Sequence, residues 1–226
     1  MMNNISSKKE DLVNIFKPYL LSKSYNYTIN DNISKELIKD IIIHKSFLAS
    51  FTYEIRSKKM KYINILTAIT NLTNSIYKYL TSDYLNSFNE YDKWLEKIGK
   101  EFLKDCLNYR KFEFGKAQKM INVTMKHLYC YNVSEEYFRY CHIALDSMTY
   151  TGRKTNSLCG GFYKNEVNEF AKTKSFSNLT YDEYILIQKE MREYLLKGKH
   201  EYIDNKLNII LSPFKAEFYI WPKYKK

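Results

Sequence analysis

Glycine and proline are scarce, since this chain of 226 residues has 6 glycines and 3 prolines. Their scarcity excludes a collagen-like repeat, a long flexible linker and an all-β protein rich in tight turns. No aliphatic run approaches the length that crosses a bilayer, and the first residues contain no apolar segment typical of a secretory signal. We therefore expect a soluble, intracellular protein without membrane contact.

Cysteine is also sparse, and the cysteines form no C-x-x-C pair. No spacing among them matches a zinc finger or an iron–sulfur cluster, so we expect neither a metal nor any other cofactor. Spread thinly along the chain, they are typical of small buried side chains in a reducing compartment. They are Cys106, Cys130, Cys141 and Cys159.

Acidic residues are outnumbered, because 25 Asp and Glu stand against 36 Lys and Arg, for a formal net charge of +11. A basic globular chain favours a polyanionic partner, most often nucleic acid. The chain is also rich in the residues that an AT-rich genome encodes, with 22 tyrosines among them. Charge alone leaves two alternatives open: a nucleic-acid-binding protein, and a scaffold whose charge only reflects genome composition.

Apolar spacing is helical along nearly the whole chain, and apolar residues make up 45% of it, enough for a packed core. We therefore expect an all-α fold in a single helical domain, residues 1–226. The segment 151–180 shows no sustained period and is rich in small and polar residues, which indicates a long loop connecting two helical lobes. The predicted helices span 12–19, 34–48, 63–80, 91–103, 116–131, 181–196 and 201–211.

The predicted helix that follows Gly115 gathers cations on one side. Lys116, Lys119, Asn122 and Lys126 are separated by three, three and four residues, so they share one face of the helix. The opposite face is apolar. At the entrance of the helix, unpaired backbone N–H groups are suited to bind an anion.

A carboxylate follows a second apolar run. Asp146 comes directly after residues 143–145, so we expect it to be partly desolvated and held in place by its neighbours. Taken alone, Asp146 is more often the N-cap of a helix beginning at Ser147 than a catalytic group, and a single lysine on a helix is most often a solvated surface residue. The occurrence of both features in order, each beside an apolar run, favours a functional site.

Two motifs mark the region 112–154. Gln118-Lys119 opens the apolar helix MINVTMKHLYCY, and Ala144-Leu145-Asp146 stands where a Pro-Val-Asp motif would be. The region resembles the helix–hairpin–helix DNA glycosylase superfamily, the endonuclease III and 8-oxoguanine glycosylase group, and most closely the archaeal 8-oxoguanine glycosylase branch. It is also similar to uncharacterised bacterial proteins with a G-x-AQK…N…H-x-x-x-D pattern. The family's Leu-Pro-Gly-Val-Gly hairpin and the proline before the aspartate are missing, and no four-cysteine cluster follows, which excludes the iron–sulfur subgroup.

The resemblance implies a two-lobed helical protein with a cleft between the lobes, in which 112–154 forms the helix–hairpin–helix-like element and the catalytic segment. It implies a DNA glycosylase in which Lys119 attacks C1′ of a flipped nucleotide, while Asp146 activates the amine and stabilises positive charge on the sugar. Lys116 and Lys126 on the same face would lower the Lys119 pKa. If Lys119 forms a Schiff base, strand cleavage follows; if Asp146 acts with water as nucleophile, only the base is released.

The implied substrate is an oxidised purine such as 8-oxoguanine, or a modified base of foreign DNA in antiviral defence. We expect a monomer that binds double-stranded DNA without a cofactor, in the cytoplasm and associated with the nucleoid if the source is bacterial or archaeal. The alternative is a non-catalytic, basic helical protein that binds nucleic acid or another partner. The expected substrate pocket comprises Gln118, Asn122 and His142, and the expected phosphate contacts are Lys111, Gly115, Lys116, Lys126, Arg153 and Lys154.

Overall fold

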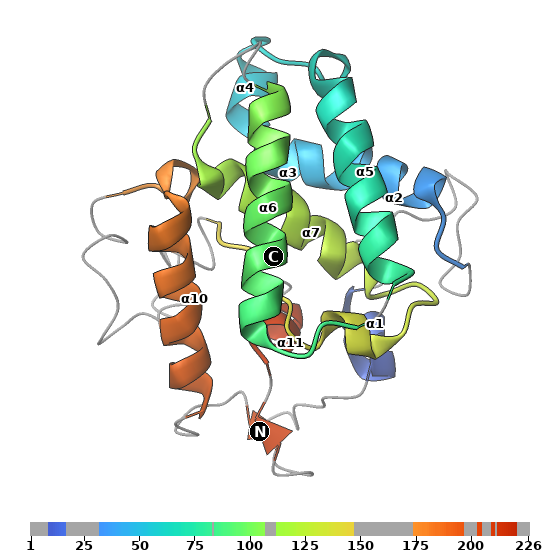
Figure 1. Ribbon diagram of the computed structural model, residues 1–226, viewed down its shortest axis with the longest axis vertical. Coiled ribbons are helices and arrows are strands. Elements are labelled where there is room, and N and C mark those ends of the chain that lie inside the picture. The colour runs from blue at the N-terminus through green and yellow to red at the C-terminus, as the bar shows by residue number, and fades with distance from the viewer. Residues whose placement is uncertain are drawn as a thin grey trace.

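The computed structural model describes residues 9–16, 32–82, 84–106, 112–146, 174–196, 203–204, 209–210 and 212–220. Helices make up nearly all the regular structure of these residues, so the all-α prediction is confirmed (Figure 1). None of the described helices is long and apolar enough to cross a membrane.

The helices follow the apolar periods of the sequence. The predicted helix 34–48 is a continuous run that includes one π-helical stretch, and the predicted helix 181–196 has the observed bounds. The helical elements are α1 (Lys9–Phe16), α2 (Lys35–Ile41), the π-helical η3 (Ile42–Phe47), α3 (Leu48–Ser50), α4 (Thr52–Arg56), η4 (Tyr62–Ile65), α5 (Leu66–Leu80), α6 (Phe88–Cys106), α7 (Phe114–Leu128), η5 (Glu135–Phe138), η6 (Phe176–Asn178), α10 (Tyr181–Leu196) and α11 (Pro213–Ile220).

The predicted helix 201–211 is wrong. Strands β1 (Ile203–Asp204) and β2 (Ile209–Ile210) pair there in antiparallel register, with Ile203 opposite Ile210. The sequence carried the signals for this outcome, because isoleucine is β-branched and favours strands, while the Asp-Asn pair that begins at the last residue of the first strand favours a turn. The apolar residues of this segment also have a helical spacing, and the prediction followed that spacing rather than the strand and turn signals.

Helix α7 is the central element of the fold. It crosses behind α6 in Figure 1 and packs against α6, η3, α3, η6, α10 and α2. Its residues from Met120 to Leu128 are all buried, so it has no solvated face. Because a buried polar group must be paired to avoid a large desolvation cost, the polar residues of α7 need partners within the protein.

One hydrophobic core runs through the described helices from α1 to α11. Aromatic rings form much of it; Tyr129, for example, packs its ring against Phe138, Phe214 and Phe218. The expected division into two lobes with a cleft between them stays a prediction. Of the expected connecting loop 151–180, residues 174–180 are described, and they contain η6 and lead into α10.

Candidate functional site

Lys119 and Asp146 meet in the structure. Lys119 lies in the second turn of α7, and Asp146 lies in the non-helical stretch 141–146. Lys119 Nζ lies 3.9 Å from Asp146 Oδ2, and the two side chains are 12% and 13% exposed. The expected proximity of the two residues in a sheltered place is therefore found, and their catalytic roles stay predictions.

Burial around Lys119 lowers the pKa of its amine. Burial lowers its pKa below the ordinary lysine value; Asp146 and Glu217 oppose that shift, whereas Lys126 and Lys116 add to it. The ring of Phe176 in η6 covers the ammonium, with Nζ 4.8 Å from the ring centroid. A lysine is nucleophilic only when deprotonated, so this environment suits covalent chemistry at Nζ.

Lys116 is held by the α3–α4 region. Its Nζ donates to the carbonyl oxygen of Ser50 at 2.8 Å and to Glu54 Oε2 at 3.1 Å, and it lies over the ring of Phe51. Because its charge is already paired with Glu54, Lys116 is not a free cation for DNA, which corrects its predicted role as a phosphate contact. It still contributes a positive charge one helical turn from Lys119.

Lys126 forms a buried ion pair with Glu217 of α11. The second carboxylate oxygen of Glu217 accepts the backbone N–H of Ala144 at 2.8 Å, two residues before Asp146. Burial raises the pKa of Glu217 and the charge of Lys126 opposes that rise. The predicted phosphate contact at Lys126 is wrong, because α11 covers this part of α7 and the ammonium is buried.

Gly115 does not offer its amide to an anion, so that prediction is also wrong. Its N–H donates to the carbonyl oxygen of Leu179 at 3.0 Å. An added Cβ would lie 1.8 Å from the carbonyl oxygen of Phe176, so only a glycine lets η6 come this close to α7. The glycine therefore serves to bring the Phe176 ring over Lys119.

Replacing Gly115 with alanine is expected to displace η6 and destabilise the protein by about 1–3 kcal/mol, as overpacking does. The clash is with backbone atoms, which move only if the whole turn moves. Urea denaturation measures the loss. The exposed Ser175→Ala on the same turn is the control and should leave the midpoint unchanged; an alanine at 115 with wild-type stability would contradict the close approach.

Gln118 tethers the segment that ends at Asp146. Its Nε2 donates to the carbonyl oxygen of Leu145 at 2.9 Å, and the N–H of Leu145 donates to Gln118 Oε1 at 3.2 Å. Asn122 Nδ2 donates to the same Oε1 and to the hydroxyl of Tyr184. Both amide residues are fully buried, so they position the segment beside Lys119, which corrects the prediction that they line an open substrate pocket.

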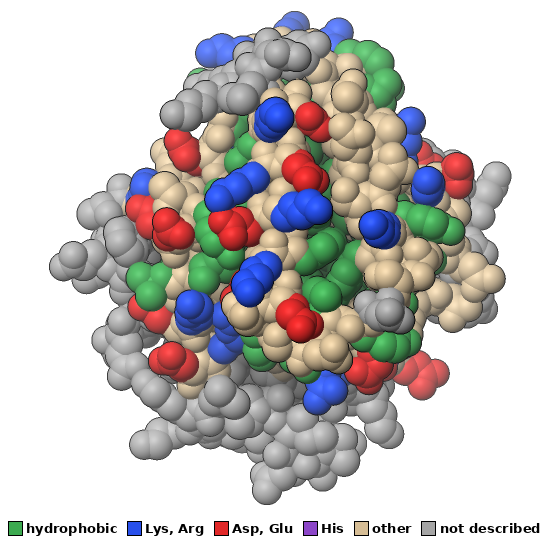
Figure 2. All heavy atoms as spheres, in the orientation of Figure 1, with side chains coloured by type: hydrophobic (Ala, Val, Ile, Leu, Met, Phe, Trp, Pro, Cys, Tyr) green, Lys and Arg blue, Asp and Glu red, His purple; other side chains and the backbone are tan. Residues whose placement is uncertain are grey.

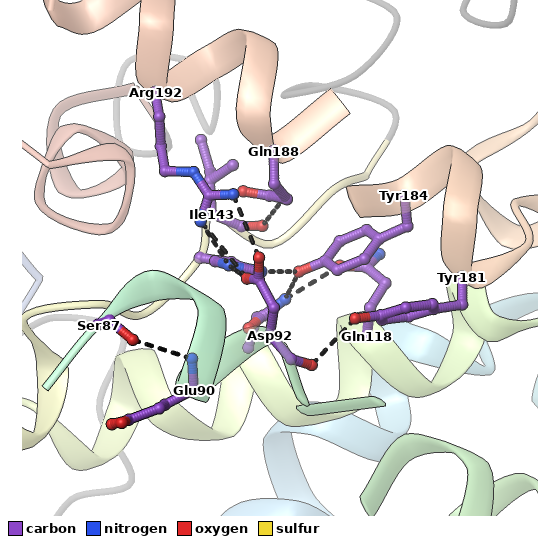
Figure 3. A network of polar contacts seen from close by, with 11 residues as sticks. Ser87, Glu90, Asp92, Gln118, Ile143, Tyr181, Tyr184, Gln188 and Arg192 are labelled. Carbon is purple, nitrogen blue, oxygen red and sulfur yellow. Dashed lines mark hydrogen bonds and ion pairs between the residues drawn. The ribbon is translucent and has the colours of Figure 1, made fainter. Parts of the chain in front are cut away.

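His142 is likewise buried and paired within the protein. Its Nδ1 lies 2.8 Å from the Tyr184 hydroxyl and its Nε2 lies 2.7 Å from Asp92 Oδ1. Arg192 of α10 also binds Asp92, as Figure 3 shows. Because the carboxylate of Asp92 can only accept a hydrogen bond, His142 Nε2 carries a proton and donates to it. His142 thus joins α6, α7 and α10 beneath the site and, like Gln118 and Asn122, does not line an open pocket.

Lowering the pH from about 7 to 5 is expected to destabilise the protein through His142. Burial lowers its folded-state pKa, while Asp92 opposes that shift and Arg192 adds to it. Below the unfolded value of about 6.5 the unfolded chain therefore binds more protons, so stability falls with pH by up to about 1.4 kcal/mol per unit.

His142→Asn removes the titrating group, and its denaturation midpoint should lack this slope over the same range. The pKa of Asp92 is also depressed, but an aspartate's contribution is lost only below its unfolded pKa of about 4, outside the window. Equal pH slopes for the wild type and His142→Asn would show that the imidazole is not held neutral.

Three of the predicted phosphate contacts, Lys111, Arg153 and Lys154, lie outside the described residues. Within the described ranges, no group of three or more His, Cys, Asp or Glu side chains could hold a metal ion. Comparison of the chain with known family models, curated proteins and solved structures found no match.

Proposed function

We propose that this protein is a DNA glycosylase that uses Lys119 as an amine nucleophile and Asp146 as its electrostatic and acid–base partner. The observation that carries the proposal is the sheltered Lys119–Asp146 pair, with its amine pKa lowered by burial. The resemblance of the region 112–154 to the helix–hairpin–helix glycosylases supplies the reaction class. The net charge of +11 supports a polyanionic substrate.

In the proposed reaction the free amine of Lys119 forms a bond to C1′ of a flipped nucleotide. The bond between C1′ and the base breaks, and its electron pair leaves with the base, which takes up a proton. The sugar develops positive charge as that bond breaks, and the carboxylate of Asp146 stabilises it in a site with little water. Opening of the sugar ring then gives a Schiff base with Lys119, from which strand cleavage proceeds.

Phe176 supports the proposal because it could contact the substrate base. Its ring covers Lys119 Nζ at 4.8 Å, so an aromatic face stands beside the proposed nucleophile. Enzymes that act on an extruded base hold it by stacking and by hydrogen bonds, and a damaged base leaves the helix more easily than an intact one. The substrate we favour is an oxidised purine, as the resemblance implies; a modified base of foreign DNA is the second candidate.

Duplexes that carry 8-oxoguanine, uracil or hydroxymethylated cytosine test the proposal when they are incubated with the protein and borohydride. The expected result is release of one of these bases together with a covalent adduct, because borohydride reduces a Schiff base to a stable amine. Base release without an adduct would identify water as the nucleophile and Asp146 as the acting residue.

The net charge also favours a second candidate, a non-catalytic helical protein that binds nucleic acid. That protein would bind the same duplexes in a salt-sensitive way and release no base. It would also bind equally well after Asp146→Asn. Binding without base release on all three duplexes would reject the glycosylase in favour of this candidate.

A further inference from the structure

A group of exposed cations lies on the turn between α4 and α5, at the end of the molecule drawn uppermost in Figure 1. We call residues 56–61 the basic turn. Four of its six residues are cations, all exposed: Arg56, Lys58, Lys59 and Lys61. Within the described part of the chain, none of them forms an ion pair with a carboxylate, unlike Lys116 and Lys126 of the candidate site.

The shape of the basic turn is well determined. The backbone N–H groups of Lys59 and Met60 both donate to the carbonyl oxygen of Glu54, at 2.9 and 3.2 Å. Met60 is buried in the core, and Lys58 adopts a left-handed conformation with φ of 55°. These constraints hold the turn against the body of the protein while its cationic side chains face solvent.

Glu54 connects the basic turn to the candidate site. Its carbonyl oxygen holds the turn, and its carboxylate binds Lys116, one helical turn before Lys119. A surface hollow lies beside Glu54 and Lys116, and η6, the element that places Phe176 over Lys119, forms part of its wall. Its lining residues are Tyr53, Glu54, Phe112, Glu113, Lys116, Ser177 and Asn178. Glu54 therefore joins the basic turn to this hollow, which Lys116 also borders.

Charge elsewhere on this face is balanced. Figure 2 shows acidic and basic side chains alternating along the exposed side of α6, whereas basic side chains stand at the upper edge without acidic neighbours. Two exposed tyrosines, Tyr53 and Tyr62, flank the basic turn, and the ring of Tyr53 lies 5.9 Å from Lys59 Nζ. Exposed cations interleaved with aromatic rings are typical of nucleic-acid-binding surfaces.

We infer that the basic turn is the surface that binds the phosphate backbone of duplex DNA and holds the duplex beside the hollow that Glu54 and Lys116 border. The inference rests on the proposed function, which names DNA as the substrate. It takes over the role that sequence reasoning assigned to Gly115, Lys116 and Lys126, which are engaged within the protein. Phosphate contacts of this kind position a duplex without reading its sequence.

The test measures binding of an undamaged duplex by fluorescence anisotropy at several salt concentrations. The variant is R56Q/K58N/K59Q/K61Q, in which asparagine suits the left-handed position 58. Each neutralised phosphate contributes about 0.9 to the slope of log affinity against log salt, so four lost cations should reduce the slope by about 3 to 4. The double variant K59Q/K61Q should lose about half of that.

The matched control is K93Q/K97Q/K100Q/K104Q, which removes the same charge from the exposed face of α6. Its slope should stay within about 1 of the wild type. An equal reduction of the salt slope in the turn variant and in the α6 variant would overturn the inference, because net charge would then explain binding. A wild-type protein that does not bind the duplex would overturn it as well. Vesicles with phosphatidylserine are a second probe, and a turn variant that loses vesicle binding alone would overturn it in favour of a membrane surface.

The outcomes for the basic turn and for the enzyme are separable. Duplex binding is measured without a damaged base, while the glycosylase assay reports base release and adduct formation. A turn variant that binds like the wild type, in a protein that releases base, would reject the basic turn and leave the glycosylase intact. Loss of binding in the turn variant, in a protein that releases no base, would support the turn and reject the enzyme.

Discussion

Replacing Lys119 with glutamine is expected to reduce the borohydride-trapped adduct to background, because no amine then remains beside Asp146 to form a Schiff base. Lys119→Arg should be equally inactive in trapping, since a guanidinium stays protonated and cannot act as the nucleophile. The adduct is measured by gel electrophoresis of labelled duplex. Exposed Lys93→Gln on α6 is the matched control and should trap as well as the wild type. A full adduct with Lys119→Gln would remove Lys119 from the mechanism.

Asp146→Asn distinguishes two roles for the carboxylate. Asp146 raises the Lys119 pKa, so its loss leaves a larger fraction of free amine. If the carboxylate served only to keep the amine charged, the variant would react faster. We expect base release to slow by about 10²–10³-fold instead, because the positive charge on the sugar loses its stabilising partner. Single-turnover base release measures the difference.

Replacing Glu217 with alanine is expected to lower the free energy of unfolding by about 3–5 kcal/mol. The change removes the carboxylate that pairs with the buried cation of Lys126 and that accepts the N–H of Ala144. Urea or guanidinium denaturation measures the loss. Since Glu217 also fixes the segment before Asp146, the surviving folded fraction should trap less DNA.

The double variant K126M/E217L is the control for Glu217. It removes both charges and keeps a similar volume, and replacing a buried ion pair in this way is often neutral or stabilising. We expect its denaturation midpoint to lie much nearer the wild type than that of Glu217→Ala. A Glu217→Ala protein with wild-type stability would show that Lys126 reaches solvent and that the ion pair is not buried.

Local pattern predicted the helices well where a single face of each is buried. In α10 and in the run from α2 to α3, apolar residues repeat with a helical period, and the period alone gives the element. The prediction from local pattern failed over 201–211. The apolar spacing of this short stretch fits a helix and a strand equally, and the β-branched isoleucines favoured the strand.

Charge pattern misled the prediction at α7. Lys116, Lys119 and Lys126 share one face, and the prediction placed phosphate contacts at Lys116 and Lys126 on that face. The structure buries it, because α11 and the α3–α4 region cover it with the carboxylates of Glu217 and Glu54. Glu217 stands within the apolar stretch around Phe214 and Phe218, which is a weak indication that its carboxylate is buried and paired. The sequence does not indicate which cation is the partner.

By itself the sequence determined that the protein is helical, that it is basic, and that Lys119 and Asp146 each stand beside an apolar run. Those properties follow from the order of neighbouring residues, which sets local conformation and side-chain character. Only the tertiary structure decided which cations are paired and which face solvent. Lys126 finds its carboxylate 91 residues away, and such a contact depends on how distant helices pack around α7, which no local spacing encodes.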